Sequence, residues 1–340
     1  MNNGNINNDA KINHRTFRKG KVILPLLISL CSLSYIYYEN KNLDNLHLIT
    51  SFDLFPFAVS ILMLFIRDFL YVYRIRVLTS QSICWSDCLL IIILWEFISA
   101  VTPTTLGGTF ISAVLFYKSG INLGKSLAFV MIIAMLDNLT FLIISPIGYK
   151  YLLNNENFLN SQLLQYSFLL SYTLMTFYTL FMFISLFVYP KLLPSVILRL
   201  FKIKFLSKYY HKVKDQMNNL TNASQYLKGY SVFYWLKILI ITFVIWSSRY
   251  LILNFVSATY VNLSLQQHID IFFKHIVMWV ATLISPTPGS TGTTELFFNA
   301  LYSDTLKNCI VPITLIWRCL TYYVYLIVGI ILLPKLLNKK

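Results

Sequence analysis

Charged side chains are scarce in this sequence: Asp, Glu, Lys and Arg make up only 12% of its 340 residues, whereas hydrophobic residues make up 57%. Soluble domains carry about 25% charged residues and 45–50% apolar ones, so this chain has too few polar side chains to cover a soluble fold. A cytosolic enzyme, a nucleic-acid-binding module and a secreted disulfide scaffold are therefore excluded. The composition indicates an all-α polytopic membrane protein.

Cysteine is also sparse, with five residues and no CxxC pair. Cys84 and Cys88 have helical spacing but no histidine near them, so we interpret them as small hydrophobic residues and expect no metal site. The sequence has no GxSxG, no HExxH, no glycine-rich phosphate loop after a strand, and no polar stretch longer than roughly 40 residues for a nucleotide-using domain. We therefore expect no catalytic residue and no cofactor.

Long apolar runs are abundant, and six of them approach or exceed the roughly 20 residues that a membrane-spanning helix requires. They are Val22–Tyr38, Leu54–Tyr73, Ser126–Tyr149, Leu163–Tyr189, Val232–Phe255 and Cys309–Leu333. No small-residue cleavage site follows the first run, so it is predicted to stay as a helix rather than to be removed as a signal peptide.

Two further apolar runs, Cys88–Val101 and Ile271–Ile284, have only 14 residues each. Each leads into a segment rich in Pro, Gly and Thr and then into a second short apolar run, which gives two units over residues 88–117 and 271–302. Runs of this length are often re-entrant, so both units are predicted to be re-entrant helical hairpins. Pairs of short crossing helices fit the charge pattern equally well, although each arm is short for a crossing.

The net charge of +15 is distributed unevenly, and its distribution predicts the orientation. The tail of residues 1–21 is basic, the loop after the first helix is acidic, and residues 190–231 form the largest basic segment. Two re-entrant hairpins place all basic segments in the cytoplasm, including the 334–340 tail, whereas a single crossing by residues 88–117 would place the 190–231 segment outside. We therefore predict an inner-membrane protein with both termini in the cytoplasm. Within the 190–231 loop, Leu198–Gly229 is predicted to be an amphipathic stretch that lies on anionic headgroups, with a solvated loop as the alternative.

The Pro/Gly segments of the two units align at an offset of 185 residues. Thr102–Gly108 (TPTTLGG) matches Thr287–Thr293 (TPGSTGT) with T-P-x-x-x-G shared. Because one hairpin enters from inside and the other from outside, the halves 22–189 and 232–333 are predicted to be inverted repeats. Interrupted helices in corresponding positions indicate a transport site near the bilayer midplane, and their freed amides and hydroxyls suit an anion. Tight turns buried in the bundle are the alternative.

Seven charged residues fall in apolar segments or at the hairpin tips, where each costs about 2.5–3.5 kcal/mol at the bilayer centre. They are Arg67, Asp68, Glu96, Asp137, Arg249, Glu295 and Arg318. Arg67 and Asp68 point about 100° apart on a helix, so each is expected to pair with another helix rather than with its neighbour. The charges are either structural ion pairs or the lining of a polar groove for a lipid headgroup. His268 and His275, near the outer surface, are interpreted as ordinary interface residues, with protonation sites as the alternative.

The candidate substrate path combines these charges with the residues of the hairpin tips. Arg67, Arg249 and Arg318 would attract phosphate, and Glu96, Asp137 and Glu295 would balance them or accept a proton. The tip residues in the path are Thr102, Pro103, Gly107, Gly108, Pro286, Thr287, Pro288, Gly289 and Gly292.

Several of these motifs resemble the lysylphosphatidylglycerol synthase transmembrane-region family of flippase-like integral membrane proteins. The resemblance rests on Trp95–Phe97 through Gly107-Gly108, on Lys118–Gly120 and Leu136-Asp137, on Ser285–Gly289 with Gly292 and Glu295, and on Trp317–Tyr323. Arg67-Asp68 with Tyr73–Arg76 is similar to members of the Bacteroidetes type. The similarity extends over roughly residues 52–335, and the PTPG–G–E element is its most specific part.

The resemblance implies a membrane domain that moves or presents lipids between leaflets. The cytoplasmic domain that transfers lysine in full-length synthases is absent from this sequence, so lysyl transfer is not expected. The sequence departs from the family pattern at Gly108 and Ile111, where many members carry the acid and arginine of G-E-x-x-R, and at Ser290, which replaces a glycine. The first departure argues against the same headgroup.

The leading hypothesis is a stand-alone flippase-like protein without ATP hydrolysis of its own, whose partners are anionic membrane lipids. Two alternatives stay open: an ion-coupled transporter of a small soluble anion or amino compound, and a non-transporting membrane partner of a lipid-modifying enzyme.

Overall fold

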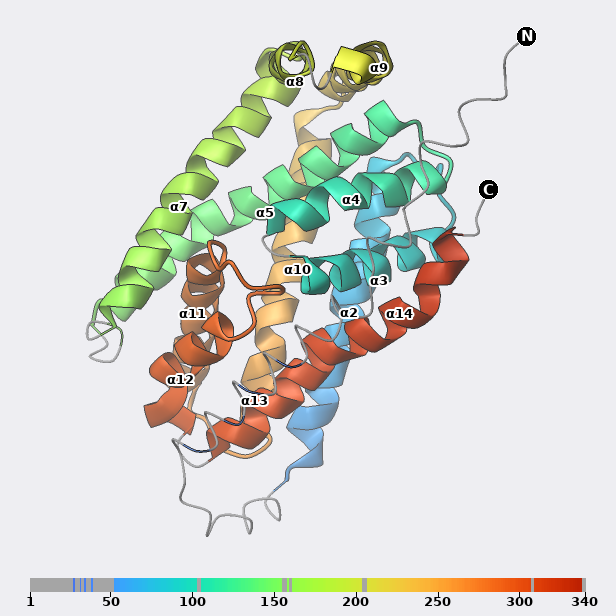
Figure 1. The fold of residues 1–340 in the computed structure, drawn as a ribbon. Helices are drawn as coiled ribbons and strands as arrows, with labels where there is room; N and C mark the ends of the chain where they lie inside the picture. Colours follow the sequence, from blue (N-terminus) through green and yellow to red (C-terminus); the bar gives the residue numbers. More distant parts are fainter. Residues whose placement is uncertain are drawn as a thin grey trace.

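The computed structural model describes residues 52–102, 105–154, 161–203, 207–306 and 309–337, with isolated positions at 27, 31, 34, 38 and 158. Within these ranges the chain is helical and contains no strand (Figure 1). The helices are α2 (Leu54–Leu78), α3 (Trp85–Val101), α4 (Thr105–Lys118), α5 (Leu123–Leu152), α7 (Gln162–Phe183), α8 (Leu192–Leu200), α9 (Tyr210–Lys228), α10 (Val232–Ala258), α11 (Leu265–Thr282), α12 (Thr293–Leu306), α13 (Ile310–Arg318) and α14 (Val324–Leu337). Two π-helical turns extend this set, η3 (Ile184–Val188) after α7 and η6 (Cys319–Tyr323) between α13 and α14, and the 3-10 turn η4 (Ser207–Tyr209) precedes α9.

Five helical units among the described residues are long and apolar enough to span a membrane. They are Leu54–Leu78, Leu123–Leu152, Gln162–Val188, Val232–Ala258 and Ile310–Pro334. Each coincides with one of the predicted spans, and the protein is a multi-pass membrane protein. The predicted first helix, Val22–Tyr38, lies outside the described residues apart from four positions.

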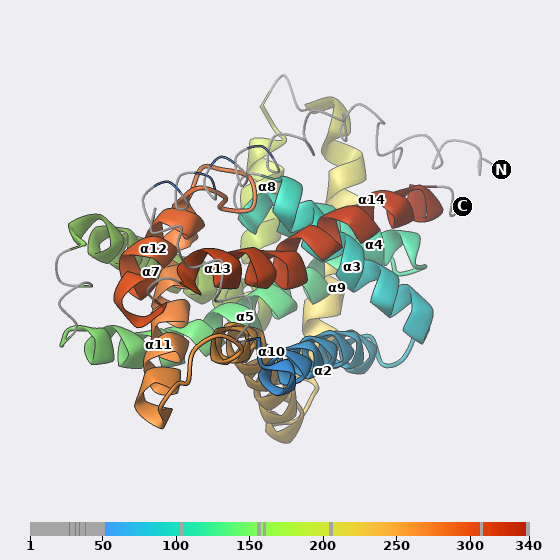
Figure 2. The ribbon, with the colours of Figure 1, turned by 90° about the horizontal axis from the view of Figure 1, so that it is seen from below.

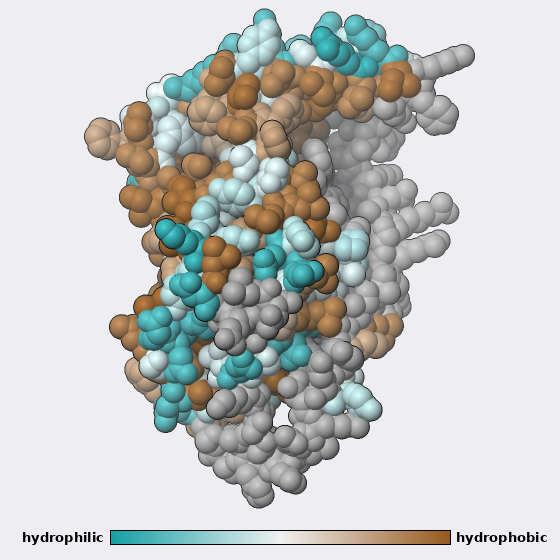
Figure 3. Space-filling view, turned by 90° about the vertical axis from the view of Figure 1, so that its left-hand side faces the viewer, coloured by the Kyte–Doolittle hydropathy of each residue, from teal (hydrophilic) through white to brown (hydrophobic). Residues whose placement is uncertain are grey.

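Helix α7 shows why these units need a bilayer rather than water. Its large apolar side chains at helical spacing remain exposed, as in Leu163, Tyr166, Leu170, Leu174 and Phe177. Figure 3 views the molecule from this side: hydrophobic residues cover much of the upper half, and hydrophilic ones gather at the top, over α8 and α9. A continuous exposed apolar stripe of this length is the surface that lipid tails cover.

Helices α2 and α10 lie side by side and antiparallel along one face of the bundle (Figures 1 and 2). The Asp53 amide at the start of α2 donates to the Thr259 carbonyl at the end of α10, at 3.0 Å. At the other end, the Tyr234 hydroxyl donates to the Val77 carbonyl at 3.2 Å. The α2–α10 pair therefore defines two ends of the molecule, to which the remaining elements can be assigned.

The first hairpin, α3 with α4, opens at the α9 end of the α2–α10 pair. Helix α3 follows α2 after the short loop 79–84, and the Ser80 hydroxyl in that loop contacts the Tyr230 hydroxyl just after α9, at 2.9 Å. Four residues separate the end of α4 from the start of α5. At the start of α5, Gly124 packs so closely on α9 that a Cβ on Gly124 would lie 2.4 Å from the Cβ of Asn219. Both outer ends of this hairpin therefore lie at one end of the molecule.

The second hairpin, α11 with α12, opens at the opposite end. Helix α11 begins at Leu265, shortly after the end of α10. Two contacts join its middle to the end of α12: Lys274 Nζ donates to Thr305 Oγ1 and the Tyr302 hydroxyl donates to the Ile271 carbonyl, each at 3.2 Å. The tips of the two hairpins meet, because a Cβ on Gly289 would lie 2.9 Å from the carbonyl oxygen of Ala100. The second Pro/Gly break therefore packs against the last turn of α3, just before the first break.

The first arms of the two hairpins are longer than predicted. Helix α3 has 17 residues and α11 has 18, whereas the apolar runs have 14. Polar and aromatic residues before each run continue the helix, and the start of α11 carries a capping box between Ser264 and Gln267. The prediction failed here because it took the start of the apolar run as the start of the helix.

The predicted basic loop, residues 190–231, contains α8 and α9. The apolar stripe of α9 is buried, with Met217, Leu220, Ala223 and Leu227 all below 7% exposure. Helix α9 therefore packs its apolar side on the protein and leaves Lys214 and Lys228 exposed.

Candidate functional site

Four arginine–carboxylate ion pairs lie inside the helical bundle. They are Arg67–Asp68 (2.7 Å), Arg74–Asp137 (2.5 Å), Arg249–Glu96 (2.7 Å) and Arg318–Glu295 (2.9 Å). Four arginines and four carboxylates balance, so this set carries no formal net charge. Pairing removes most of the cost of placing charges in an apolar interior, provided that each partner stays in place.

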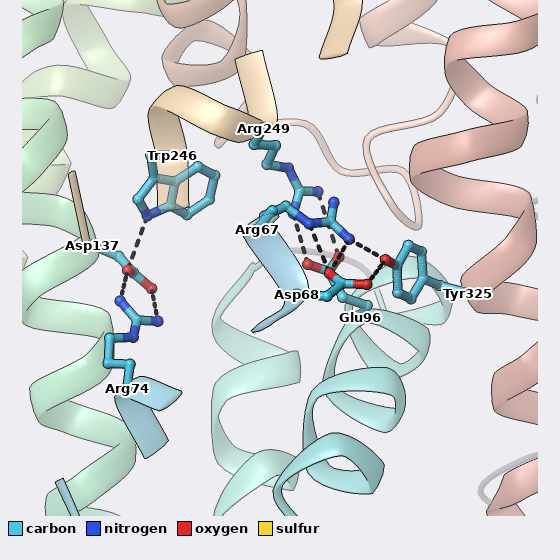
Figure 4. A network of polar contacts seen from close by, with 8 residues as sticks. All are labelled: Arg67, Asp68, Arg74, Glu96, Asp137, Trp246, Arg249 and Tyr325. Atoms are coloured by element: carbon cyan, nitrogen blue, oxygen red, sulfur yellow. Dashed lines mark hydrogen bonds and ion pairs between the residues drawn. The ribbon is translucent and has the colours of Figure 1, made fainter. Parts of the chain in front are cut away.

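Two of these pairs form a cluster where α2, α3, α10 and α14 meet (Figure 4). Arg67 Nε and Nη2 both donate to Asp68 Oδ1, at 2.9 and 2.7 Å. The Tyr325 hydroxyl donates to Asp68 Oδ2 at 2.5 Å and accepts a hydrogen bond from Arg67 Nη2. Arg249 Nη1 donates to Glu96 Oε1 at 2.7 Å, and Arg67 and Arg249 lie next to one another above the two carboxylates.

The contact between Arg67 and Asp68 corrects the prediction that neighbours on a helix would pair elsewhere. The arginine side chain is long enough to fold back along α2 and span the 100° between the two positions. Tyr325 from α14 then binds both groups, which supplies the interhelical contact that the prediction assigned to other charges.

The third pair joins α2 to α5 on the other side of α10 (Figure 4). Asp137 Oδ1 accepts hydrogen bonds from Arg74 Nη1 at 2.5 Å and from Trp246 Nε1 at 2.9 Å. The Thr242 hydroxyl accepts a further bond from Arg74 Nη1 at 3.1 Å. Arg74 lies close to the end of α2, but its side chain is 2% exposed and serves as the partner of Asp137.

The fourth pair, Arg318–Glu295, joins α13 to α12 of the second hairpin. Glu295 accepts a 2.6 Å hydrogen bond from the Gly292 amide at the start of α12, and its carboxylate pairs with Arg318. This explains the spacing of Gly292 and Glu295, since a glutamate three residues into a helix reaches back to the first free amide. Gly289 and Ser290 have positive φ values of 59° and 54°, and this reversal carries the chain from α11 back toward α12.

Hydroxyl groups satisfy the rest of the second break internally. Thr287 Oγ1 donates to the Thr291 carbonyl at 2.7 Å, and Ser285 Oγ contacts the hydroxyls of Thr287 and Thr293 at 2.9 and 2.8 Å. Irregular backbone at membrane depth is tolerated where such partners exist. Pro286 and Pro288 lie in the same turn, and Pro286 is exposed.

Two cavities lie on either side of the Glu96–Arg249 pair. The tip cavity, about 150 Å³, lies where the hairpin tips meet, and the α5 cavity, about 190 Å³, lies against α5. The tip cavity includes Thr102, His275, Gly289, Ser290, Thr294 and Arg318 in its lining, and the α5 cavity includes Tyr71, Arg74, Asp137, Asn138, Tyr178 and Trp246. Glu96, Ser99, Arg249 and Trp279 line both, so the ion pair forms part of the wall between them.

The comparison with known families agrees with this architecture. The sequence profile of the family described as "Lysylphosphatidylglycerol synthase TM region" matches residues 22–329 of the chain. The chain belongs to this family. No curated protein and no solved structure matches it.

The lysylphosphatidylglycerol synthase TM-region family is related to the handling of lipid headgroups. In this member, the two cavities show where polar side chains are available. Of the predicted path residues, Glu96, Thr102, Asp137, Arg249, Gly289 and Arg318 line the cavities. Neither cavity is lined by the other predicted path residues with described side chains, which are Arg67, Asp68, Pro286, Thr287, Pro288, Gly292 and Glu295. Gly107 and Gly108 lie in the first turn of α4, and Pro103 falls outside the described residues.

Four residues of the site in this family member were not predicted from the sequence: Arg74, Trp246, Tyr325 and His275. Arg74 lies seven residues after Arg67, which places both arginines on one face of α2, and Trp246 lies three residues before Arg249. Helical spacing from a predicted site residue could therefore have identified Arg74 and Trp246. Tyr325 carries no such signal, because aromatic residues are common throughout the chain. His275 was interpreted as an ordinary interface residue, whereas it is 4% exposed and packs against Tyr250 and Trp317.

Proposed function

We propose that this protein translocates or presents an anionic phospholipid or lipid-linked headgroup between the two leaflets, without ATP hydrolysis of its own. The observation that carries the proposal is the pair of polar cavities, each lined by arginine, separated by a single ion pair in the middle of the bundle. A headgroup needs such a polar route because the hydrocarbon region cannot solvate it, whereas the acyl chains can stay in lipid.

In this proposal α3–α4 and α11–α12 are re-entrant hairpins from opposite leaflets, and the two halves are inverted repeats around α2 and α10. Support comes from the outer ends of the hairpins, which lie at opposite ends of the α2–α10 pair, and from the contact between their tips. The second arms, α4 and α12, have 14 residues each. At 1.5 Å per residue they are about 21 Å long, short of the roughly 30 Å hydrocarbon core.

The same proposal places both termini and the α8–α9 segment in the cytoplasm of an inner membrane, because these segments of the sequence are basic. Single cysteines introduced in a cysteine-free background test it with an impermeant thiol reagent. Ser264→Cys should be labelled from outside, and Ser207→Cys only after permeabilisation. Labelling of Ser207→Cys from outside contradicts the orientation.

Translocation is testable with fluorescent lipids in proteoliposomes. The wild-type protein should accelerate movement of anionic or polyprenyl-linked lipids between leaflets, and Glu96→Gln should slow it about tenfold or more, because Arg249 then lacks a charged partner. The matched control is Asp270→Asn, since Asp270 pairs with Lys274 at 2.6 Å but lines neither cavity. Wild-type rates equal to those of empty liposomes across all these lipids contradict the proposal.

One observation favours a second candidate, an ion-coupled transporter of a small soluble anion. Cavities of about 150 and 190 Å³ hold a phosphate-sized group but not a whole lipid. Uptake of a soluble anion that depends on Asp137, in vesicles that show no lipid movement, identifies this function instead.

A further inference from the structure

Helix α8 lies across the end of the bundle rather than along it. Figure 1 shows α8 end on at the top of the molecule, whereas α10 runs through much of the height of the picture. Helix α8 has nine residues and is about 14 Å long, too short to span the roughly 30 Å hydrocarbon core. It follows the spanning unit Gln162–Val188 after a short turn at residues 189–191, so it begins at one end of that unit.

One side of α8 is apolar and exposed. Val196 is 40% exposed, Leu200 is 53% exposed and Ile203, just after the helix, is 56% exposed. Val196 and Leu200 are four positions apart, which places them on the same side of the helix. Ile184 and Val188, at the end of the preceding spanning unit, are exposed as well. The apolar surface that faces lipid tails therefore continues from this spanning unit onto α8.

A second side of α8 is basic. Lys191, Arg199 and Lys202 are exposed, and residues 190–203 contain no acidic residue. At about 100° per residue, the three basic positions fall within about 80° of one another, beside the apolar positions. Tyr189, which is exposed just before them, is of the residue type that anchors at the level of the headgroups. An apolar side next to a basic side is typical of a helix that lies in the interface of an anionic membrane.

The third side of α8 packs on the protein and fixes where the other two sides point. Pro194 is buried. Leu193, Ile197 and Leu198 are partly buried against the hydrophobic core to which Met217 of α9 belongs. Because this side is held by the core, the exposed apolar side cannot turn inward without breaking these contacts. Helix α8 is therefore already oriented to meet a membrane surface.

Helix α9 lacks this arrangement, although it makes up most of the stretch Leu198–Gly229 that was predicted to lie on anionic headgroups. Its apolar side is buried against the protein, and its exposed side carries Lys214, Asn218, Asn222 and Gln225. Among the described side chains of these two helices, the exposed large apolar ones are therefore on α8. The contact with the membrane surface is better assigned to α8.

We propose that α8 is an interfacial helix that binds the anionic phospholipids of the leaflet beside it. Lys191, Arg199 and Lys202 bind lipid phosphate groups, and Val196 and Leu200 insert between the upper parts of the acyl chains. Each basic residue near an anionic surface strengthens association about fivefold. This contact gathers anionic lipid at one edge of the protein, and it does not depend on translocation through the two cavities.

The depth of α8 is testable with the full chain in nanodiscs of phosphatidylcholine mixed with phosphatidylglycerol. A fluorescent thiol probe is attached to single cysteines in a cysteine-free background, and the quencher is carried high on a lipid acyl chain. Probes at Val196→Cys and Leu200→Cys should be quenched severalfold more than a probe at Asn222→Cys, because Asn222 lies on the exposed polar side of α9. Equal quenching at the three positions overturns the proposal.

The preference for anionic headgroups is a second readout. Quenching of the Leu200→Cys probe by brominated phosphatidylglycerol is compared with quenching by brominated phosphatidylcholine. Replacing Lys191, Arg199 and Lys202 together by glutamine should lower the relative affinity for phosphatidylglycerol about fivefold or more, because the phosphate groups lose their cationic partners. An unchanged preference contradicts the role given to these residues.

The matched control removes the same charge at the same end of the molecule. Lys208, Lys214 and Lys228 are exposed and lie outside α8, so their combined replacement by glutamine should leave the preference for phosphatidylglycerol at the probe nearly unchanged. An equal loss in both triple variants shows a general effect of net charge and overturns the assignment to α8.

A second copy of the chain is the other occupant that these measurements can detect. Cross-linking of Leu200→Cys between copies in proteoliposomes, combined with a probe that lipid quenchers do not reach, shows that protein covers α8 and contradicts the proposal. Wild-type protein that moves no lipid but shows the expected quenching contradicts the lipid-translocation function alone, so the two proposals fail separately.

Discussion

Replacing Glu295 by alanine should destabilise the protein by about 3–5 kcal/mol, because breaking a buried ion pair leaves the other charge without compensation. Glu295 is 0% exposed and its partner Arg318 is 5% exposed. The same substitution removes the acceptor of the Gly292 amide, so the first turn of α12 loses its cap as well. Reversible unfolding in mixed micelles, followed by helical circular dichroism, measures the loss.

Two companion variants separate these effects. Asp304→Ala removes an exposed acid from the same helix and should change stability by less than about 0.5 kcal/mol. Glu295→Gln combined with Arg318→Leu removes both charges, keeps a side chain that can cap α12, and should recover much of the lost stability. Equal destabilisation by Glu295→Ala and Asp304→Ala contradicts the role assigned to the pair.

Replacing Gly289 by alanine should separate the tips of the two hairpins. The residue has φ of +59°, and a Cβ would lie 2.8 Å from Tyr322 Cε2 and 2.9 Å from the carbonyl oxygen of Ala100. A positive φ costs an alanine about 1–2 kcal/mol, and overpacking adds about 1–3 kcal/mol. Because Tyr322 also donates to the Ala100 carbonyl at 3.2 Å, the substitution should break that bond and reduce translocation along with stability.

Gly120→Ala provides the matched control. Gly120 also has a positive φ, +93°, but a Cβ there meets nothing within 4 Å. It should show only the backbone cost of about 1–2 kcal/mol and normal translocation. If the unfolding free energies and translocation rates of the two variants match, the contact between the tips has no role beyond backbone conformation.

The spans were the most predictable part of the fold, and the reason is physical. Bilayer thickness sets a length that an apolar run either reaches or does not, so the Val232–Phe255 run corresponds to α10, Val232–Ala258. The starts of the hairpin arms were less predictable. Helix α11 begins at Leu265, six residues before its apolar run, because a capping box stabilises a helix start independently of hydrophobicity.

Seven of the eight charged residues in the four ion pairs were identified from the cost of burying them, but Arg74 and the pairing were not. Pairing depends on which faces of distant helices meet, and sequence spacing does not contain that information. Asp137 illustrates this, since its partner Arg74 is 63 positions away and lies close to the end of α2, where an arginine is ordinarily an anchor at the interface. Arg67 illustrates the reverse, because its partner is the adjacent residue.

The balance of four arginines and four carboxylates has an electrical consequence. A charge that crosses a membrane potential of 100 mV changes energy by about 2.3 kcal/mol, but a neutral set that moves as one body does no electrical work. The membrane potential therefore contributes little energy to a movement of the four ion pairs as one body. Under the proposed function, any voltage sensitivity of transport would therefore measure the charge of the translocated group and of any ions that move with it.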